Sequence, residues 1–202
     1  MRGSRNTQEH FYYLDKNYDF YNKDTIVISG TSAGGMSAIS WVQYVADNTK
    51  KAKVYGMPDS SIFLIDYYNP ITKKQDSRNT LVIRQKLIGK MNDGDVPRPM
   101  RECTKDLGDS ISCTDSTNFV QYIDIPVFYI QSTYDEYVVR YVLGADCLTN
   151  KLPPYSMITC DQKTRNLIED YRSQLMKAIQ HMKKNKSDLG IWGIACIQHV
   201  LE

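Results

Sequence analysis

The chain has 202 residues, 42% of them apolar, which is enough for one sizeable hydrophobic core and too short for two ordinary domains. We therefore expect a single domain over residues 1–202. Its 25 basic and 23 acidic residues give a formal net charge of +2, and the lysines and arginines gather into no arm or stripe. This balance argues against a nucleic-acid partner. The longest apolar runs are far shorter than the roughly 20 residues that a membrane-spanning helix needs.

Strand-like and helix-like segments alternate along the chain. Residues 25–29 form a short β-branched run typical of a buried strand, and helical spacing of apolar residues follows from residue 38 to about residue 48. Further strands are predicted at 53–57, 62–65 and 125–130, and further helices at 80–88, 136–143 and 164–182. Residues 89–118 hold two prolines and few apolar side chains, so we expect a loop there. The alternation predicts an α/β fold with a largely parallel sheet.

The motif Gly30-Thr31-Ser32-Ala33-Gly34 fits the nucleophile-elbow pattern G-x-S-x-G, and it lies between a predicted strand and a predicted helix as that pattern requires. It makes Ser32 the candidate nucleophile. Side chains at Gly30 and Gly34 are expected to collide with the neighbouring strand or helix. The backbone N–H of Ala33 is a candidate oxyanion donor. The alternatives are a plain glycine-rich turn or a phosphate-binding loop, but the lysine of a nucleotide P-loop is missing.

A serine hydroxyl needs a base to act as a nucleophile at neutral pH, and histidine is the usual one. The chain has three histidines. In this fold the base follows the serine in sequence, which excludes His10. His181 lies at the end of a charged helical segment, where a solvated capping role is the ordinary interpretation. His199 follows the apolar run 191–197 and is the predicted base.

The third member of such a site is a carboxylate on a loop after a later strand, where it orients the imidazole. Asp135 meets that description because it follows the 125–130 strand. Asp124 precedes the same strand and should lie at the opposite edge of the sheet. Three other carboxylates remain in contention at this point: Glu136, Asp59 and Asp66.

Five short motifs follow one another along the chain in an order that a known family shares. They are Arg2-Gly3-Ser4-Arg5, Ser29-Gly30-Thr31-Ser32-Ala33-Gly34-Gly35, Asp59-Ser60-Ser61-Ile62-Phe63-Leu64, Pro126-Val127-Phe128 with Tyr134-Asp135, and Ala195-Cys196-Ile197-Gln198-His199. Together they resemble the motifs of the pectin acetylesterases and Notum-type carboxylesterases, with Ser61 replacing a family glycine. The resemblance implies Asp135 rather than Glu136 as the acid of the triad and His199 as its base.

The resemblance also implies a fold and a function. Such proteins are secreted α/β-hydrolases, with a mostly parallel sheet and flanking helices, that hydrolyse acyl esters on a polysaccharide or an acylated protein without metal or cofactor. Family members carry further N-terminal strands with a glycine-rich oxyanion loop and continue beyond the histidine. Residues 1–6 also have no apolar core of a signal peptide. We therefore expect a chain that is incomplete at its N-terminus and cut shortly after His199. The alternative function is a catalytically impaired remnant with a binding or structural role.

The five cysteines suggest folding in an oxidising compartment, and the sequon Asn185-Lys186-Ser187 points the same way. Cys103 and Cys113 bracket a polar loop suited to a small disulfide ring, and they match a disulfide position of the resembling family. Two of the remaining three, Cys147, Cys160 and Cys196, are able to pair. We expect Cys196 to be bonded, because a bridge there would fix the strand end that positions the histidine.

Overall fold

The structure is a computed structural model and describes residues 3–64, 67–70, 74–75, 96–149 and 155–200. Its elements, in chain order, are α1 (Gly3–Tyr18), η1 (Phe20–Asn22), β1 (Thr25–Thr31), α2 (Ala33–Asn48), β2 (Lys53–Asp59), β3 (Tyr68–Asn69), β4 (Lys74–Gln75), α4 (Arg98–Leu107), η2 (Ser112–Thr114), α5 (Ser116–Phe119), η3 (Val120–Tyr122), β5 (Val127–Ser132), η4 (Val138–Val142), α6 (Gln162–Asn185) and β6 (Leu189–Ile194). Of the four elements labelled η, η4 is a π-helical turn, and η1, η2 and η3 are 3₁₀-helical.

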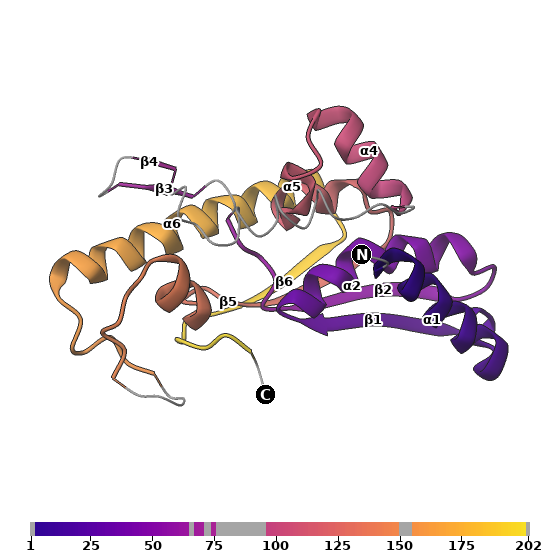
Figure 1. The fold of residues 1–202 in the computed structure, drawn as a ribbon, viewed down its shortest axis with the longest axis horizontal. Coiled ribbons are helices and arrows are strands. Elements are labelled where there is room, and N and C mark those ends of the chain that lie inside the picture. Colours follow the sequence, from indigo (N-terminus) through magenta and orange to yellow (C-terminus); the bar gives the residue numbers. More distant parts are fainter. Residues whose placement is uncertain (1–2, 65–66, 71–73, 76–95, 150–154, 201–202) are drawn as a thin grey trace.

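The described residues contain a four-stranded sheet in the order β1-β2-β5-β6, and every neighbouring pair in it is parallel (Figure 1). The two short strands β3 and β4 pair separately as an antiparallel ribbon. The predicted α/β fold with a largely parallel sheet is confirmed. Because all four strands run the same way, the segments that follow β1, β5 and β6 leave the sheet at the same edge.

One face of this sheet carries the hydrophobic core. Side chains such as Ile26, Val54 and Val127 point from the strands into a cluster that includes Val42 of α2 and Leu175 of α6. The 24-residue helix α6 is amphipathic: its buried positions recur every three or four residues, so that one face packs against the core along most of the helix. The predicted helix at 164–182 is thus present and extends further at both ends.

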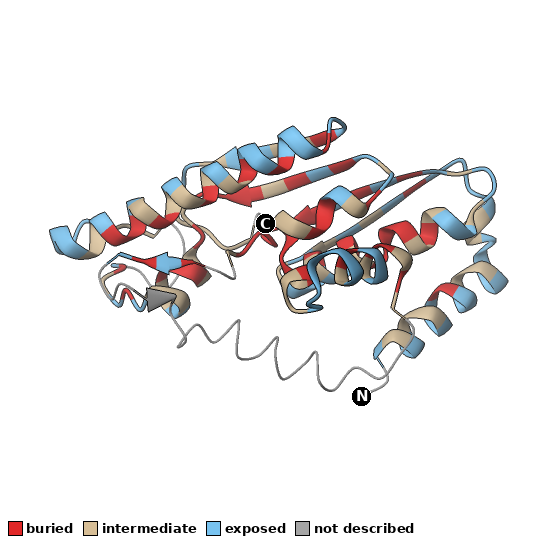
Figure 2. Ribbon diagram, turned by 90° about the horizontal axis from the view of Figure 1, so that it is seen from above, coloured by how far each residue is buried: buried red, intermediate tan, exposed pale blue. Residues whose placement is uncertain are grey.

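The opposite face of the sheet is exposed. Strand side chains alternate between the two faces, and burial alternates with them along the strands (Figure 2). The side chains on the outer face keep 38% to 54% of their surface exposed, and they are Val27, Tyr55, Met57, Phe128 and Trp192. Within the described residues, the sheet is therefore covered on one side and presents apolar side chains on the other.

The predicted strand at 62–65 is wrong over residues 62–64, and residue 65 lies outside the described part of the chain. Ile62 and Phe63 are buried but belong to no strand. The Ile62 N–H donates to the Gln131 side-chain carbonyl oxygen (2.9 Å), and the Leu64 N–H donates to the Tyr171 hydroxyl (3.3 Å). Since side chains satisfy these buried amides, the run needs no neighbouring strand.

The expectation of a loop over 89–118 is wrong for α4, η2 and the start of α5, which lie within it, whereas residues 96–97 and 108–111 belong to no helix or strand. Residues 89–95 and the predicted helix at 80–88 lie outside the described residues. The prolines that suggested a loop stand at the start of α4, with Pro97 as its N-cap and Pro99 in its first turn, where a missing N–H has no intrahelical partner to lose. Cys103 and Pro99 are buried, and Gly108 ends the helix in a left-handed conformation (φ 68°). The helix is therefore amphipathic despite its polar composition.

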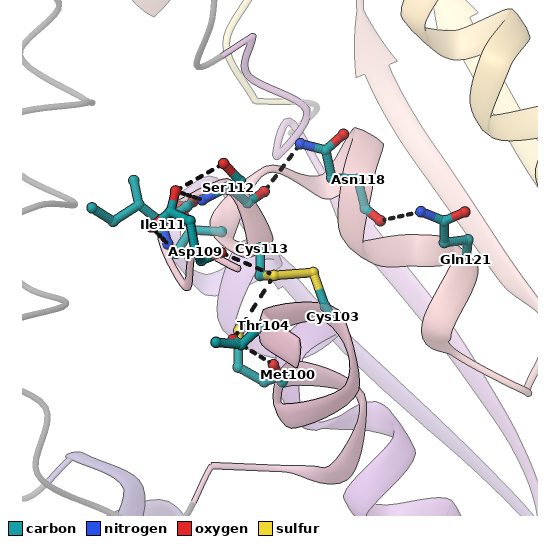
Figure 3. Close-up of a disulfide and its surroundings, with 10 residues drawn as sticks. Met100, Cys103, Thr104, Asp109, Ile111, Ser112, Cys113, Asn118 and Gln121 are labelled. Carbon is teal, nitrogen blue, oxygen red and sulfur yellow. Dashed lines mark hydrogen bonds between the residues drawn. A yellow bond between two sulfur atoms is a disulfide. The ribbon is translucent and has the colours of Figure 1, made fainter. Parts of the chain in front are cut away.

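A disulfide joins Cys103 on α4 to Cys113 on η2, ten residues further along the chain (Figure 3). Both sulfurs are buried. The turn between them is held by Asp109, whose carboxylate accepts hydrogen bonds from the backbone N–H groups of Ile111 and Ser112, both at 3.0 Å. This is the bond that the spacing and the family resemblance predict.

A second disulfide joins Cys147 to Cys160, and Cys196 is an exposed free cysteine. The expectation that Cys196 is bonded is therefore wrong. Cys147 and Cys160 lie with their Cα atoms 4.9 Å apart, within the range that a disulfide spans. The end of β6 is fixed instead by hydrogen bonds from β5, because the Ser132 hydroxyl donates to the Cys196 carbonyl and the Thr133 N–H donates to the Ile194 carbonyl.

Candidate active site

The nucleophile elbow is a one-residue turn between β1 and α2. Ser32 is that residue, and its backbone has φ 56° and ψ −120°, a conformation that costs a non-glycine residue on the order of 1–3 kcal/mol. Its N–H donates to the Asp59 carbonyl at the end of β2 (2.9 Å), and its carbonyl accepts the N–H of Met36 (3.0 Å). The neighbouring strand and the first turn of α2 therefore hold the strained residue in place.

The elbow depends on glycine at two positions where the backbone approaches very closely. A Cβ on Gly30 would lie 2.3 Å from the Gly34 carbonyl oxygen, and one on Gly35 would lie 2.8 Å from the carbonyl oxygens of Asp59 and Gly30. A Cβ on Gly34 would meet nothing within 4 Å. The prediction of crowding is thus confirmed for Gly30 and wrong for Gly34, because Gly35 and not Gly34 faces the sheet.

The structure brings Ser32, His199 and Asp135 into one hydrogen-bonded series. The Nε2 atom of His199 lies 2.8 Å from Ser32 Oγ, and its Nδ1 atom lies 2.9 Å from each carboxylate oxygen of Asp135. The three residues follow β1, β6 and β5, respectively, at the carboxyl edge of the sheet. His199 is 167 positions from Ser32 and 64 positions from Asp135 in the sequence, and the parallel topology makes the three residues neighbours.

The competing carboxylates occupy other positions. Glu136 forms an ion pair with Arg140, and Asp124 lies before β5 with Arg98 at 2.6 Å. Asp59 is at the end of β2, where its carboxylate accepts the Ser60 hydroxyl (2.8 Å). Asp66 lies outside the described residues. The side chain of Asp135 is 1% exposed, and its Oδ1 also accepts the N–H of Val138 (3.2 Å).

The other two histidines are remote from this series. His10 lies on the exposed side of α1. His181 is exposed near the end of α6, where its Nε2 lies 2.9 Å from the side-chain nitrogen of Asn185. Within the described residues, His199 is thus the histidine that contacts Ser32.

Comparisons with known proteins show the family and the fold of the chain. The family model described as pectinacetylesterase matches residues 1–202. The chain belongs to the pectinacetylesterase family. Its structure is similar to that of the Wnt deacylase Notum from Drosophila, with a TM-score of 0.63 and 22% sequence identity over 88% of this chain and 46% of that chain. The chain thus spans about half the length of this relative, and a search of the curated proteins found no match.

In this member of the pectinacetylesterase family, burial lowers the pKa of His199, but the hydrogen bond and charge of Asp135 outweigh it, so that the pKa lies above the ordinary histidine value. Burial raises the pKa of Asp135, and the hydrogen bond from His199 partly offsets that increase. An ionised carboxylate is acceptor-only, so the Nδ1 that faces it carries the proton. The neutral imidazole then presents the lone pair of Nε2 to the Ser32 hydroxyl.

Two aromatic rings flank the imidazole of His199. The ring centroid of Tyr137 is 5.3 Å from that of the imidazole, and the centroid of Phe63 is 6.2 Å from it. Sequence reasoning missed both contacts. Phe63 belongs to one of the resembling motifs and Tyr137 lies two residues after Asp135, but neither position reveals a ring contact without the fold.

An apolar pocket of about 440 Å³ begins beside Ala33, the first residue of α2. Its lining includes Met36, Trp41, Met100 and Phe119. This volume lies in the range of pockets that hold small molecules. Ala33 also stands at the N-terminal end of α2, where backbone N–H groups and the positive end of the helix dipole favour negative charge.

Two kinds of feature are absent from the described residues. No group of three or more histidine, cysteine, aspartate or glutamate side chains there is arranged to hold a metal ion. Among the helices there, none combines the length and the apolar composition that crossing a membrane requires.

The elbow geometry predicts different effects for three single alanine substitutions. Gly30→Ala and Gly35→Ala should lower the free energy of unfolding by at least about 1–3 kcal/mol, because the new Cβ meets backbone atoms that cannot move aside. Gly34→Ala is the matched control and should be neutral or slightly stabilising, since it adds a helix-favouring residue in open space. Urea unfolding measures all three. Equal losses at Gly34 and Gly30 would contradict this packing.

Proposed function

We propose that this chain is a serine hydrolase that cleaves carboxylic esters, with Ser32 as nucleophile, His199 as general base and Asp135 as the acid that orients it. The observation that carries the proposal is the continuous series from Ser32 Oγ through both imidazole nitrogens to a buried carboxylate, at 2.8 and 2.9 Å. Such a series supplies what a serine lacks at neutral pH, namely an acceptor for its proton. Membership of the pectinacetylesterase family supports ester bonds as the target.

The proposed reaction has two halves. As Ser32 Oγ attacks the ester carbonyl carbon, its proton passes to Nε2 of His199, and Asp135 stabilises the resulting imidazolium. The negative charge on the former carbonyl oxygen develops beside the N-terminal end of α2, where the Ala33 N–H is the proposed donor. The C–O bond then breaks, His199 returns the proton to the leaving alcohol, and water releases the acyl group as a carboxylic acid by the same steps. This chemistry uses no metal and no cofactor.

The substrate is proposed as an acyl ester on a larger carrier, either acetyl groups on a polysaccharide or a fatty acyl group on a protein. The family's name supports the first, and the printed description of the Drosophila relative as a deacylase of Wnt supports the second. The apolar pocket is lined by Ala33, the residue after Ser32, but not by Ser32 itself, and it does not favour one of these substrates over the other. We also propose that the protein is secreted, for which the two disulfides provide support.

The direct test uses a soluble chromogenic acetate ester and the Ser32→Ala variant. We expect hydrolysis by the parent chain and a fall of kcat by about 10⁶-fold in the variant, the size of loss seen when a triad serine is removed from a well-studied protease. Ser29→Ala is the control, because Ser29 is an exposed serine in the adjoining strand. If Ser32→Ala hydrolyses the ester as fast as the parent and Ser29→Ala, Ser32 is not the nucleophile.

The pH dependence of kcat/KM tests the roles of His199 and Asp135. The base must be neutral, so activity should fall as the pH decreases through the raised pKa of His199, at a higher pH than for an ordinary histidine. Asp135→Asn removes the charge that raises this pKa while burial still lowers it. The variant should therefore shift the acid limb to lower pH and reduce kcat by on the order of 10⁴-fold.

The matched control for this pH experiment is Glu136→Gln, which should retain kcat and shift the acid limb less than Asp135→Asn does, because Glu136 contributes less than Asp135 to raising the pKa of His199. An acid limb that stays in place in Asp135→Asn, or an equal loss of kcat in both variants, would show that Asp135 does not orient the base.

A further inference from the structure

The sequon Asn185-Lys186-Ser187 lies where α6 ends, and the middle residue is buried whereas the two outer residues are exposed. Asn185 and Ser187 are exposed, whereas Lys186 between them is 7% exposed. Lys186 continues the inward face of α6, four residues after the buried Met182. Its ammonium group donates to the carbonyl of Ile123 (2.8 Å) and pairs with Asp188 (2.7 Å). The anchored middle residue turns the asparagine and the hydroxyl residue outward together.

The backbone leaves the helix at this point. The N–H of Lys186 still bonds to the Met182 carbonyl, but its own φ of −141° and ψ of 104° are extended. The side-chain nitrogen of Asn185 lies 2.9 Å from His181 Nε2. A carboxamide nitrogen carries two hydrogens, so replacing one by a sugar leaves the other available for His181. Asn185 is exposed, so a substituent on its Nδ2 atom meets solvent, and that atom keeps one hydrogen as a donor.

We infer that Asn185 is a site of N-linked glycosylation. In this transfer the Asn185 Nδ2 atom bonds to C1 of the reducing-end sugar, the bond from C1 to a phosphate oxygen of a lipid-linked glycosyl diphosphate breaks, the lipid diphosphate leaves, and a proton is lost from Nδ2. Glycosylation of such sequons takes place in secreted proteins, and the disulfides Cys103–Cys113 and Cys147–Cys160 are an independent sign of folding in an oxidising compartment.

The glycan stands away from the candidate active site. Asn185 precedes β6 and His199 follows it, so the two lie beyond opposite ends of a six-residue strand, roughly 20 Å apart. Ester hydrolysis should therefore be the same with and without the glycan, and the inference rests on the proposed secretion but not on the proposed reaction.

The test expresses the 202-residue chain behind a secretory signal in a eukaryotic host. We expect a peptide-N-glycosidase to increase the electrophoretic mobility of the secreted protein and to convert Asn185 to aspartate, seen as a mass change in its peptide. Asn185→Gln and Ser187→Ala should each abolish both effects, and Ser187→Thr should keep them. All three changes lie at exposed positions, so their melting temperatures should match that of the parent chain treated with the glycosidase.

A second site in the same chain makes a negative result decisive. Asn48 is also the last residue of a helix, and an extended residue, Thr49, follows it. Lys50→Ser turns this segment into a sequon in the same local geometry. Glycosylation at Asn48 of the Lys50→Ser variant, with Asn185 unmodified in that same secreted protein, would overturn the inference.

Discussion

The geometry of the candidate site depends on the close packing of α2 against the ends of β1 and β2. Gly30 and Gly35 leave no room for a side chain, so a single residue separates the strand from the helix. That contact forces Ser32 into a positive-φ conformation, and the hydrogen bond from its N–H to the Asp59 carbonyl fixes the turn. The serine hydroxyl is consequently held at the carboxyl edge of the sheet, where segments following the other strands reach it. Strain at a single residue is thus maintained by packing that does not involve its side chain.

Buried polar side chains at the end of β5 hold the other half of the site. Gln131 is fully buried, accepts the N–H of Ile62 and donates to the Ser132 carbonyl, which ties the loop after β2 to β5. The hydroxyl of Thr133 donates to the carbonyl of Ile194 at the end of β6, and the hydroxyl of Ser132 donates to the carbonyl of Cys196 just after it. These bonds order the two segments that carry Asp135 and His199. A buried polar group with satisfied hydrogen bonds specifies a geometry more sharply than apolar packing does, because a buried donor or acceptor left without a hydrogen bond lowers the stability of the fold.

Local patterns predicted the elements that are locally determined. β1, α2 and the elbow follow from a β-branched run, helical spacing and a glycine motif, and α6 follows from its long amphipathic pattern. In contrast, α1 escaped detection because Phe11 is its one described buried residue, which leaves little periodicity to detect. The apolar run at residues 62–64 was predicted as a strand because it is apolar. Two of its backbone N–H groups bond instead to the side chains of Gln131 and Tyr171, which are distant in sequence. The proline-rich start of α4 misled because the same residue type ends a helix or begins one.

The residues of the candidate site also differ in whether the sequence was enough to predict them. The motif identified Ser32, and sequence order with the adjoining apolar run identified His199. Pattern alone left Asp135 and Glu136 open, because adjacent residues differ only in the direction in which the loop turns them, and the family resemblance favoured Asp135. The ring contacts of Phe63 and Tyr137 with His199 required the tertiary structure. Cys196 was misassigned because cysteine pairing depends on Cα distances that sequence does not contain.

We propose that the hydrogen bond from Ser32 to His199 makes the serine hydroxyl nucleophilic. Covalent labelling with a fluorophosphonate, which reacts with activated serines, tests this claim without any assumption about the acyl group or carrier. We expect a single labelled peptide, carrying the phosphonyl group on Ser32, and loss of that label in His199→Ala while the variant stays folded. Labelling that is undiminished in folded His199→Ala, or a label on another residue with Ser32 unmodified, would contradict it.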